Sequence, residues 1–301
     1  MMRIGIDARM LGFSGVGRYT ENLIRELLQI DTKNQYIIFV QKQQAKNFQF
    51  LISNFQSIFN FAKQNKVLTK SGSYSKFSQP KAGPPWAENI KIIETDAPIY
   101  SLKEQSNFLK TVNRQMLDVM HFTHFNVPIF YRKPYVVTIH DLTPLYYQGK
   151  KRATFLERAA YKMVLKNALK KSQKIVAISQ FTKNDILKNF PFIDQEKIKV
   201  IYEGAISRFA PISNYQFLIS NQFSNNQKPI TNYLLYVGLW REHKNLLGLI
   251  RAFEKIKKTT NYKLQTTKLV IVGKPDPVYR EVQDAAQSSP YNKDIIITGY
   301  V

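Results

Sequence analysis

The fold of this chain is decided by one stretch, YVGLWREHKNLLGLIRAF (residues 236–253). An apolar run that begins at residue 233 reaches Gly238, and apolar side chains from residue 246 onward recur at helical spacing. The stretch therefore predicts a β-strand that passes through a short loop into an α-helix. Strand–loop–helix units of this kind build parallel α/β sheets.

The loop of this stretch carries three basic side chains, Arg241, His243 and Lys244. A helix N-terminus already has partial positive charge and free N–H groups, so cations there add to the field and do not neutralise it. The arrangement predicts a bound anion, for which phosphate is the commonest biological candidate. The alternative is a solvated charge cluster with no ligand.

Strands and helices alternate on both sides of residues 205–231, a polar segment that we interpret as an interdomain connection. The sequence thus predicts an N-terminal domain over residues 1–204 and a C-terminal domain over residues 232–301. Predicted strands of the first domain are 3–9, 36–40, 90–94, 119–123, 135–139, 174–178 and 198–202, with helices at 16–28, 48–61, 102–116, 152–171 and 180–189. Predicted strands of the second domain are 233–237, 269–272 and 295–297, with helices at 245–258 and 278–287.

Composition sets broad limits on the class of protein. The chain has 301 residues, of which 44% are hydrophobic and 22% charged, as in globular proteins. It has no cysteine, which excludes disulfides and cysteine nucleophiles and fits a reducing compartment. Arg3, Asp7 and Arg9 interrupt the first apolar run, and no run is long enough to span a membrane. A cytoplasmic protein is expected.

The formal net charge is +23, which attracts polyanions such as nucleic acid, anionic lipid or phosphorylated substrates. Four basic residues recur at i, i+4 spacing on the predicted helix 152–171, namely Arg158, Lys162, Lys166 and Lys170. Such a stripe suits an anionic membrane surface, and the alternative is an ordinary solvated face. No recognisable nucleic-acid-binding module accompanies the charge, so no specific nucleic acid is expected.

A glycine-rich loop, GFSGVGRY (residues 12–19), lies between the first strand and the first helix. Gly15 and Gly17 let the backbone approach a ligand at the helix N-terminus. Two known phosphate loops match in part, but Arg18 replaces the P-loop lysine and Thr20 replaces the third glycine of the dinucleotide fingerprint. A tight turn that simply requires glycine is the alternative interpretation.

His140 and Asp141 follow a buried-looking strand within VVTIHDLTPLYY (residues 136–147). Ligand sites of open α/β sheets lie at this end of the strands, where a histidine can donate to a substrate or transfer a proton. The alternative is a histidine bonded to a neighbouring carbonyl. His121 and His124 flank another strand end, but scattered histidines do not predict a metal site, and none is expected.

Glu203 and Gly204 close the first alternating block. A glutamate at this position could reach the cleft between the two domains. A plain strand-ending turn is the alternative.

Six stretches, taken together and in this order, resemble the group 1/group 4 glycosyltransferases, and their mannosyltransferase-like branch in surface polysaccharide and lipopolysaccharide synthesis most of all. The resemblance extends from residue 3 to residue 301. The stretches are RIGIDARMLGFSGVGRYTENLIREL, VVTIHDLTPLYY, KIVAISQFTKNDI, KVIYEGA, YVGLWREHKNLLGLIRAFEKI and KLVIVGKPD.

The resemblance implies the GT-B fold, two facing Rossmann-like domains with parallel sheets. It also implies transfer of a sugar from a nucleotide-sugar donor, such as a GDP- or UDP-sugar, with retention of configuration and without a metal or cofactor. The acceptor would be a lipid-linked or growing saccharide. The enzyme would lie in the cytoplasm, on the inner face of the membrane.

The resemblance also assigns roles at the donor site. Lys244 matches the lysine that holds the donor diphosphate and stabilises charge on the leaving nucleotide. The assisting arginine of several members directly follows the glycine that matches Gly238, where this chain has Leu239. Arg241 is expected to substitute for that arginine.

On the first domain, Gly15 and Gly17 are expected to face the donor phosphates and the acceptor. His140 matches a histidine that contacts the donor sugar, so we expect His140 and Lys244 to be catalytic. Asp141 and Glu203 are added as candidate binding residues.

The family's second domain continues past residue 301 to a Glu-x7-Glu motif that binds the donor. The second domain of this chain is therefore expected to be incomplete, and residues 1–301 are expected to be inactive by themselves. Two alternatives remain open, a saccharide- or phosphate-binding module without turnover and a nucleic-acid-binding protein.

Overall fold

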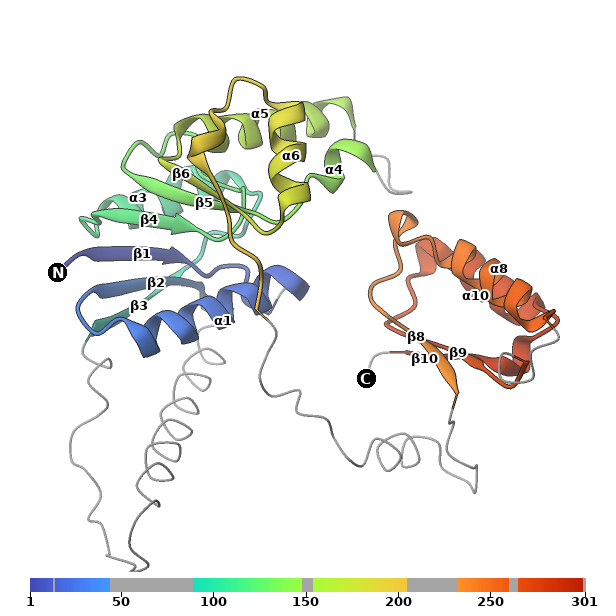
Figure 1. Ribbon diagram of the computed structural model, residues 1–301. Coiled ribbons are helices and arrows are strands. Elements are labelled where there is room, and N and C mark those ends of the chain that lie inside the picture. The colour runs from blue at the N-terminus through green and yellow to red at the C-terminus, as the bar shows by residue number, and fades with distance from the viewer. Residues whose placement is uncertain (13, 44–88, 148–153, 205–231, 260–264, 300–301) are drawn as a thin grey trace, which may run out of the picture. The chain divides into compact units, whose positions relative to one another are not determined.

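The computed structural model describes residues 1–12, 14–43, 89–147, 154–204, 232–259 and 265–299 (Figure 1). The chain divides into two compact units, residues 1–142 with 156–204 and residues 143–155 with 205–301. Residues 143–155, which the sequence analysis assigned to the first domain, thus group with the second unit. The predicted helix 48–61 and the predicted connection 205–231 lie outside the described residues.

The first unit is built on a seven-stranded sheet with strand order β3-β2-β1-β4-β5-β6-β7. Every neighbouring pair is parallel. The order reverses between β1 and β4, because the chain first builds outward on one side of β1 and then on the other. The strands are β1 (Arg3–Asp7), β2 (Gln35–Gln41), β3 (Ile90–Thr95), β4 (Val119–Phe122), β5 (Tyr135–Ile139), β6 (Lys174–Ala177) and β7 (Ile198–Val200).

Helices cover both faces of this sheet, as the short runs of buried β-branched residues require. Helix α1 packs Ile24 and Leu28 against one face, and the opposite face receives Phe108 against Phe39, with ring centroids 5.7 Å apart. The helical segments are α1 (Ser14–Ile30), the π-helical turn η2 (Glu104–Phe108), α3 (Leu109–Asn113), α5 (Phe155–Lys171), α6 (Gln180–Asn189) and the 3₁₀ turn η3 (Gln195–Lys197).

The second unit contains a three-stranded parallel sheet of order β10-β9-β8. Its core includes Trp240, Ile250, Phe253 and Ile271, contributed by the sheet, α8 and the loop between β8 and α8. Its elements are the short helix α4 (Thr143–Tyr146), β8 (Tyr233–Val237), the 3₁₀ turn η4 (Glu242–Lys244), α8 (Leu246–Lys257), β9 (Lys268–Val272), η5 (Pro277–Tyr279), α10 (Arg280–Ser288), η6 (Asn292–Asp294) and β10 (Ile295–Gly299).

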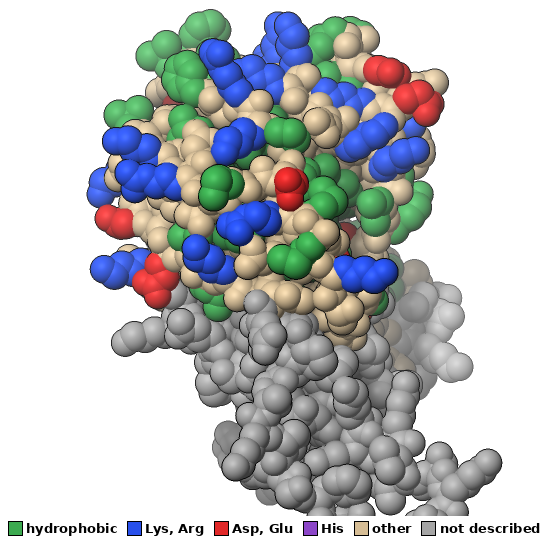
Figure 2. Space-filling view, turned by 90° about the vertical axis from the view of Figure 1, so that its left-hand side faces the viewer, with side chains coloured by type: hydrophobic (Ala, Val, Ile, Leu, Met, Phe, Trp, Pro, Cys, Tyr) green, Lys and Arg blue, Asp and Glu red, His purple; other side chains and the backbone are tan. Residues whose placement is uncertain are grey.

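Much of the positive charge lies at the amino edge of the first sheet, where Figure 2 shows Lys and Arg side chains over a wide area. The C-termini of the crossover helices reach the same edge. The Lys197 ammonium donates to the carbonyls of Leu169 and Lys170 at the end of α5, at 2.9 and 2.8 Å, and Lys133 donates to the carbonyl of Asn113 at the end of α3. These lysines donate to the free carbonyls at the helix ends and interact favourably with the negative ends of the helix dipoles. Part of the positive charge therefore has a structural role.

Candidate functional site

His140 lies at the carboxyl edge of the first sheet, directly after β5. Its Nε2–H donates to the carbonyl of Thr123, 2.9 Å away, because a carbonyl can only accept. Its Nδ1 faces Oε1 of Glu203 at 3.3 Å. The His140 carbonyl accepts from the hydroxyl of Thr182, in helix α6, at 3.1 Å. Ser179 caps the start of α6, because its side chain accepts from the N–H of Thr182.

The bond to Thr123 fixes one proton of the His140 ring, because Nε2 must carry a proton to donate to a carbonyl. The other ring nitrogen, Nδ1, faces the Glu203 carboxylate, which is partly exposed. Thr123 and Glu203 together fix the orientation of the imidazole.

A second buried polar chain connects α1 to the same edge. The Thr138 hydroxyl contacts Nε2 of His121 at 2.8 Å and the Tyr19 hydroxyl at 3.1 Å, and the Tyr19 ring meets the His140 ring edge-on at 4.9 Å. Burial lowers the pKa of His121 to about 4, with a further lowering from His140. The neutral His121 ring and Thr138 therefore connect β4 to β5 within the sheet.

The structure separates the roles of the two loop glycines. A Cβ on Gly17 would lie 2.6 Å from the carbonyl oxygen of Met10, so packing alone requires glycine there. A Cβ on Gly15 would have no atom within 4 Å, and Gly15 is exposed. Gly15, in the first turn of α1, is therefore the loop glycine that leaves backbone open to a ligand.

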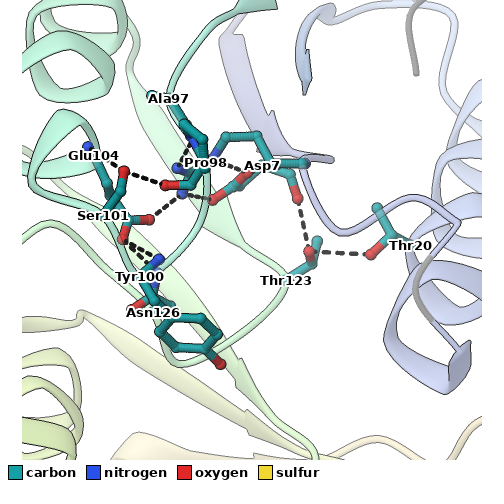
Figure 3. A network of polar contacts seen from close by, with 10 residues as sticks. Asp7, Thr20, Ala97, Pro98, Tyr100, Ser101, Glu104, Thr123 and Asn126 are labelled. Carbon is teal, nitrogen blue, oxygen red and sulfur yellow. Dashed lines mark hydrogen bonds and ion pairs between the residues drawn. The ribbon is translucent and has the colours of Figure 1, made fainter. Parts of the chain in front are cut away.

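A buried ionic network lies just beyond β1, and sequence reasoning missed it (Figure 3). Arg9 bonds to both carboxylate oxygens of Asp7, at 2.9 and 2.8 Å, and to Glu104 at 2.6 Å, with its guanidinium 3.5 Å from the Phe108 ring centroid. Burial alone would lower the pKa of Arg9, but the two carboxylates raise it above its usual value. Burial raises the pKa of Glu104, and Arg9 opposes that rise.

The network extends to the loops that end β1 and β4. The Asn126 amide donates to Glu104 Oε2 at 2.6 Å, and the Thr123 hydroxyl donates to the carbonyl of Asp7 at 2.7 Å. The hydroxyl of Thr20, on α1, contacts that of Thr123 at 3.0 Å. These bonds fix the backbone at the point where the strand order reverses, which is where open α/β sheets bind ligands.

In the second unit, Lys244 lies in the turn η4, one residue before the cap of α8. Asn245 has the left-handed φ of 50°, and its side chain accepts from the N–H of Gly248 at 3.1 Å. Lys244 is exposed, and within the described parts of the chain its ammonium has no hydrogen-bond or ion-pair partner. The sequence predicted Lys244 at the start of the helix. In the structure it is the last residue of the turn η4, and α8 begins at Leu246 after the cap Asn245.

Arg241 is held to its neighbours, since its guanidinium pairs with Asp276 and donates to the Trp240 carbonyl at 3.0 Å. Beside it, Gly238 and Gly273 end β8 and β9. Gly273 has φ of 144°, and a Cβ there would lie 2.1 Å from the carbonyl oxygen of Gly238. This close approach requires glycine at position 273. Gly238 and Gly273 thus leave the ends of β8 and β9 without side chains at these two positions.

Two further features are absent from the described residues. No group of three or more His, Asp or Glu side chains could hold a metal ion there. In the same residues, no helix is long and apolar enough to cross a membrane.

Comparison with protein families gives two adjacent matches. Residues 73–205 match the model described as Glycosyltransferase Family 4, and residues 219–301 match Glycosyl transferases group 1. The chain belongs to the group 1/family 4 glycosyltransferases. A search of curated proteins gave no match.

Solved structures agree with this family at the level of the fold. WaaG, a glycosyltransferase involved in lipopolysaccharide biosynthesis, aligns over 99% of this chain and 70% of its own, with 12% identity and a TM-score of 0.54. A UDP-forming alpha,alpha-trehalose-phosphate synthase from Burkholderia xenovorans aligns over 100% and 73%, with 10% identity and a TM-score of 0.52. The MnaA–UDP co-structure from S. aureus aligns over 100% and 69%, with 11% identity and a TM-score of 0.50.

The predicted α/β class and GT-B fold of this glycosyltransferase are confirmed. The structure brings together several predicted site residues in the first unit, with Nδ1 of His140 facing Glu203 and Asp141 next to His140 in the chain. In the second unit, Arg241 and Lys244 share the loop after β8. The ligand roles of all these residues stay predictions.

Proposed function

We propose that the chain transfers a hexose from a nucleotide-sugar donor to a lipid-linked or growing saccharide acceptor, with retention of configuration and without a metal. The observation that carries the proposal is the edge of the second sheet, where unpaired Lys244 lies in the loop after strand β8, which ends at Gly238. UDP- or GDP-linked mannose is the first donor to test, from the mannosyltransferase-like resemblance.

The chemistry of transfer explains why such an edge is useful. As the glycosidic bond to the donor breaks, positive charge develops on the sugar and negative charge on the diphosphate. Lys244 places a cation in the loop where that negative charge would develop, and a positive charge aimed at the leaving diphosphate lowers the barrier. Arg241 contributes to the same field while Asp276 holds it in place.

The first unit supplies the second part of the reaction. The Nδ1 edge of His140, which Thr123 orients and Glu203 flanks, is suited to contact a sugar hydroxyl, and Gly15 leaves the start of α1 open to an oxygen-rich ligand. Three similar structures support a nucleotide-sugar reaction by what they act on or hold: lipopolysaccharide synthesis for WaaG, UDP formation for the trehalose-phosphate synthase, and bound UDP for MnaA.

Two measurements test this function. First, thermal unfolding of residues 1–301 is followed with a panel of UDP- and GDP-sugars, and one class of nucleotide sugar should raise Tm. Second, in a version of the enzyme that transfers sugar, Lys244→Ala should lower kcat/KM by about 10²-fold or more. Lys255→Ala, at the far end of the same helix, is the matched control and should match wild type.

Near-wild-type kinetics of Lys244→Ala would contradict the assignment. Protection by nucleotide sugars without transfer would favour the non-catalytic binding module. The expectation that residues 1–301 are inactive alone stays a prediction, which transfer by that chain in the same assay would contradict.

Membrane association from the cytoplasmic side is part of the proposal. The first turns of α5 expose Phe155 (78%), Leu156 (76%) and Met163 (55%) beside the basic stripe. Apolar side chains flanked by cations suit insertion at an anionic interface, with about 1 kcal/mol from each basic residue. Liposome sedimentation should show binding to anionic vesicles that falls when Arg158 and Lys162 are both replaced by Gln. Equal binding to neutral and anionic vesicles would contradict it.

A further inference from the structure

Beside His140, four aromatic side chains form a connected group, Tyr100, His124, Phe125 and Tyr161, which we call the aromatic row. Ring centroids lie 6.2 Å apart for Tyr100 and His124, 4.2 Å for His124 and Phe125, and 4.8 Å for Phe125 and Tyr161. The His124 ring stacks towards His140 at 6.5 Å. The row therefore leads from the surface at Tyr100 to the candidate site.

Tyr100 has a backbone conformation that a bulky residue rarely adopts. Its φ is 64°, in the left-handed region, which costs roughly 1–2 kcal/mol for a residue with a Cβ. Burial of the ring does not offset this cost, because 65% of Tyr100 is exposed. Figure 3 shows the ring turned away from the buried network, so the conformation presents it outward.

The buried network anchors the row from below. Glu104 Oε2 accepts from the backbone N–H of Tyr100 at 3.2 Å and from the Asn126 amide at 2.6 Å, while Oε1 accepts from Arg9. One carboxylate thus joins the loop that carries Tyr100 to the loop that carries His124 and Phe125. The rings are positioned before any ligand arrives, which reduces the entropy lost on binding.

Two polar atoms of the row are buried and lack partners among the described residues, Nδ1 of His124 and the hydroxyl of Tyr161. A buried polar atom without a hydrogen bond is costly, so its presence beside a functional edge indicates a ligand group that bonds to it. Burial lowers the pKa of His124 to about 4, so the imidazole is neutral and offers one donor and one acceptor.

We propose that the aromatic row is the subsite for the acceptor saccharide, with the apolar face of a pyranose ring on Tyr100 and its hydroxyls bonded to His124 and Tyr161. This assignment rests on the proposed function. A sugar fits because it combines an apolar C–H face with neutral hydroxyls. Phosphate does not fit, because Arg9, the cation beneath the row, is buried and paired with two carboxylates.

Saturation-transfer NMR on the full chain tests the subsite, with the methyl glycosides of mannose, glucose, galactose and N-acetylglucosamine as probes. Tyr100→Gly removes the ring and relieves the backbone, so it should fold and lose saturation transfer by about fivefold or more. Phe130→Ala, at an exposed ring outside the row (64%), is the matched control and should leave the signal unchanged. Tyr161→Phe should weaken transfer to the sugar that binds.

Thermal protection by UDP or GDP is measured on the same samples, because it reports the second unit and separates failure of the subsite from failure of the proposed function. Undiminished saturation transfer to Tyr100→Gly would overturn the subsite, as would absence of transfer to wild type for all four sugars. Tyr161→Phe with an unchanged signal would remove the hydroxyl from the account.

Discussion

At the carboxyl edge of the first sheet, Arg9 and Glu104 are each 1% exposed and bonded to one another, whereas at the second sheet's edge Lys244 and Arg241 lie in solvent. The first edge buries Arg9 between two carboxylates, which fixes the loops, and it exposes aromatic rings and the acidic side chains of Asp141 and Glu203. The second presents cations beside strand ends that lack side chains. The contrast teaches that a buried, paired cation fixes loops, whereas an exposed cation without a partner among the described residues is the better candidate for a phosphate contact.

The largest difference between the edges is expected in stability. Arg9→Met leaves Asp7 and Glu104 buried without their partner and should cost about 3–5 kcal/mol of unfolding free energy. Arg241→Met breaks an exposed pair with Asp276 and should cost about 0–1 kcal/mol. Urea unfolding measures both. Equal losses would mean that the first edge is not built on its buried network.

The next effect concerns His140. Loss of a hydrogen bond to a charged or polar ligand group costs about 1.5–3 kcal/mol, so His140→Ala should reduce transfer roughly ten- to a hundredfold. Glu203→Gln, which keeps the size of the partner, should reduce it less. A His140→Ala variant with full activity and a lower Tm would instead show that the histidine only supports the Thr123 carbonyl.

The last effect is the pH dependence of folding, which is absent at neutral pH and grows only as the pH falls. The folded pKa of His124 is about 4, below the unfolded value of about 6.5, so its contribution is complete above pH 6.5 and is lost as pH falls towards 4. The slope is at most about 1.4 kcal/mol per pH unit for one histidine. Burial raises the pKa of Glu104, so its contribution to stability changes with pH in the opposite direction. Wild type and His124→Asn both contain Glu104, so this contribution cancels when their curves are compared.

His124→Asn should therefore flatten the dependence of unfolding free energy on pH between 6.5 and 4.5. Parallel curves for wild type and His124→Asn would contradict the neutral, buried state of this histidine.

Periodicity predicted most of the fold because the strands are short apolar runs, and those at the centre of the first sheet are buried. The predicted spans 135–139, 180–189 and 233–237 match the observed bounds. The predicted helix 102–116 is instead a π-helical turn followed by α3, which ends before Met116 with its left-handed φ of 49°. Apolar spacing does not report such local conformations.

The sequence predicted the positions of His140 and Glu203 after strands, and it predicted Lys244 in the loop before a helix, while the ligand roles of all three stay predictions. Arg9 and Glu104 are 95 positions apart, and nothing local in either segment indicates their contact. Gly273 was not singled out, although its place directly after a predicted strand was a usable signal.

The central claim is that the second edge binds the donor diphosphate through Lys244, and calorimetric binding of UDP, GDP and their nucleosides tests it most directly. Wild type should bind one diphosphate more tightly than its nucleoside. Lys244→Ala should weaken that diphosphate about tenfold or more and leave the nucleoside unchanged, because only the diphosphate meets the ammonium. Unchanged diphosphate affinity in Lys244→Ala, or equal weakening of nucleoside and diphosphate, would contradict the account.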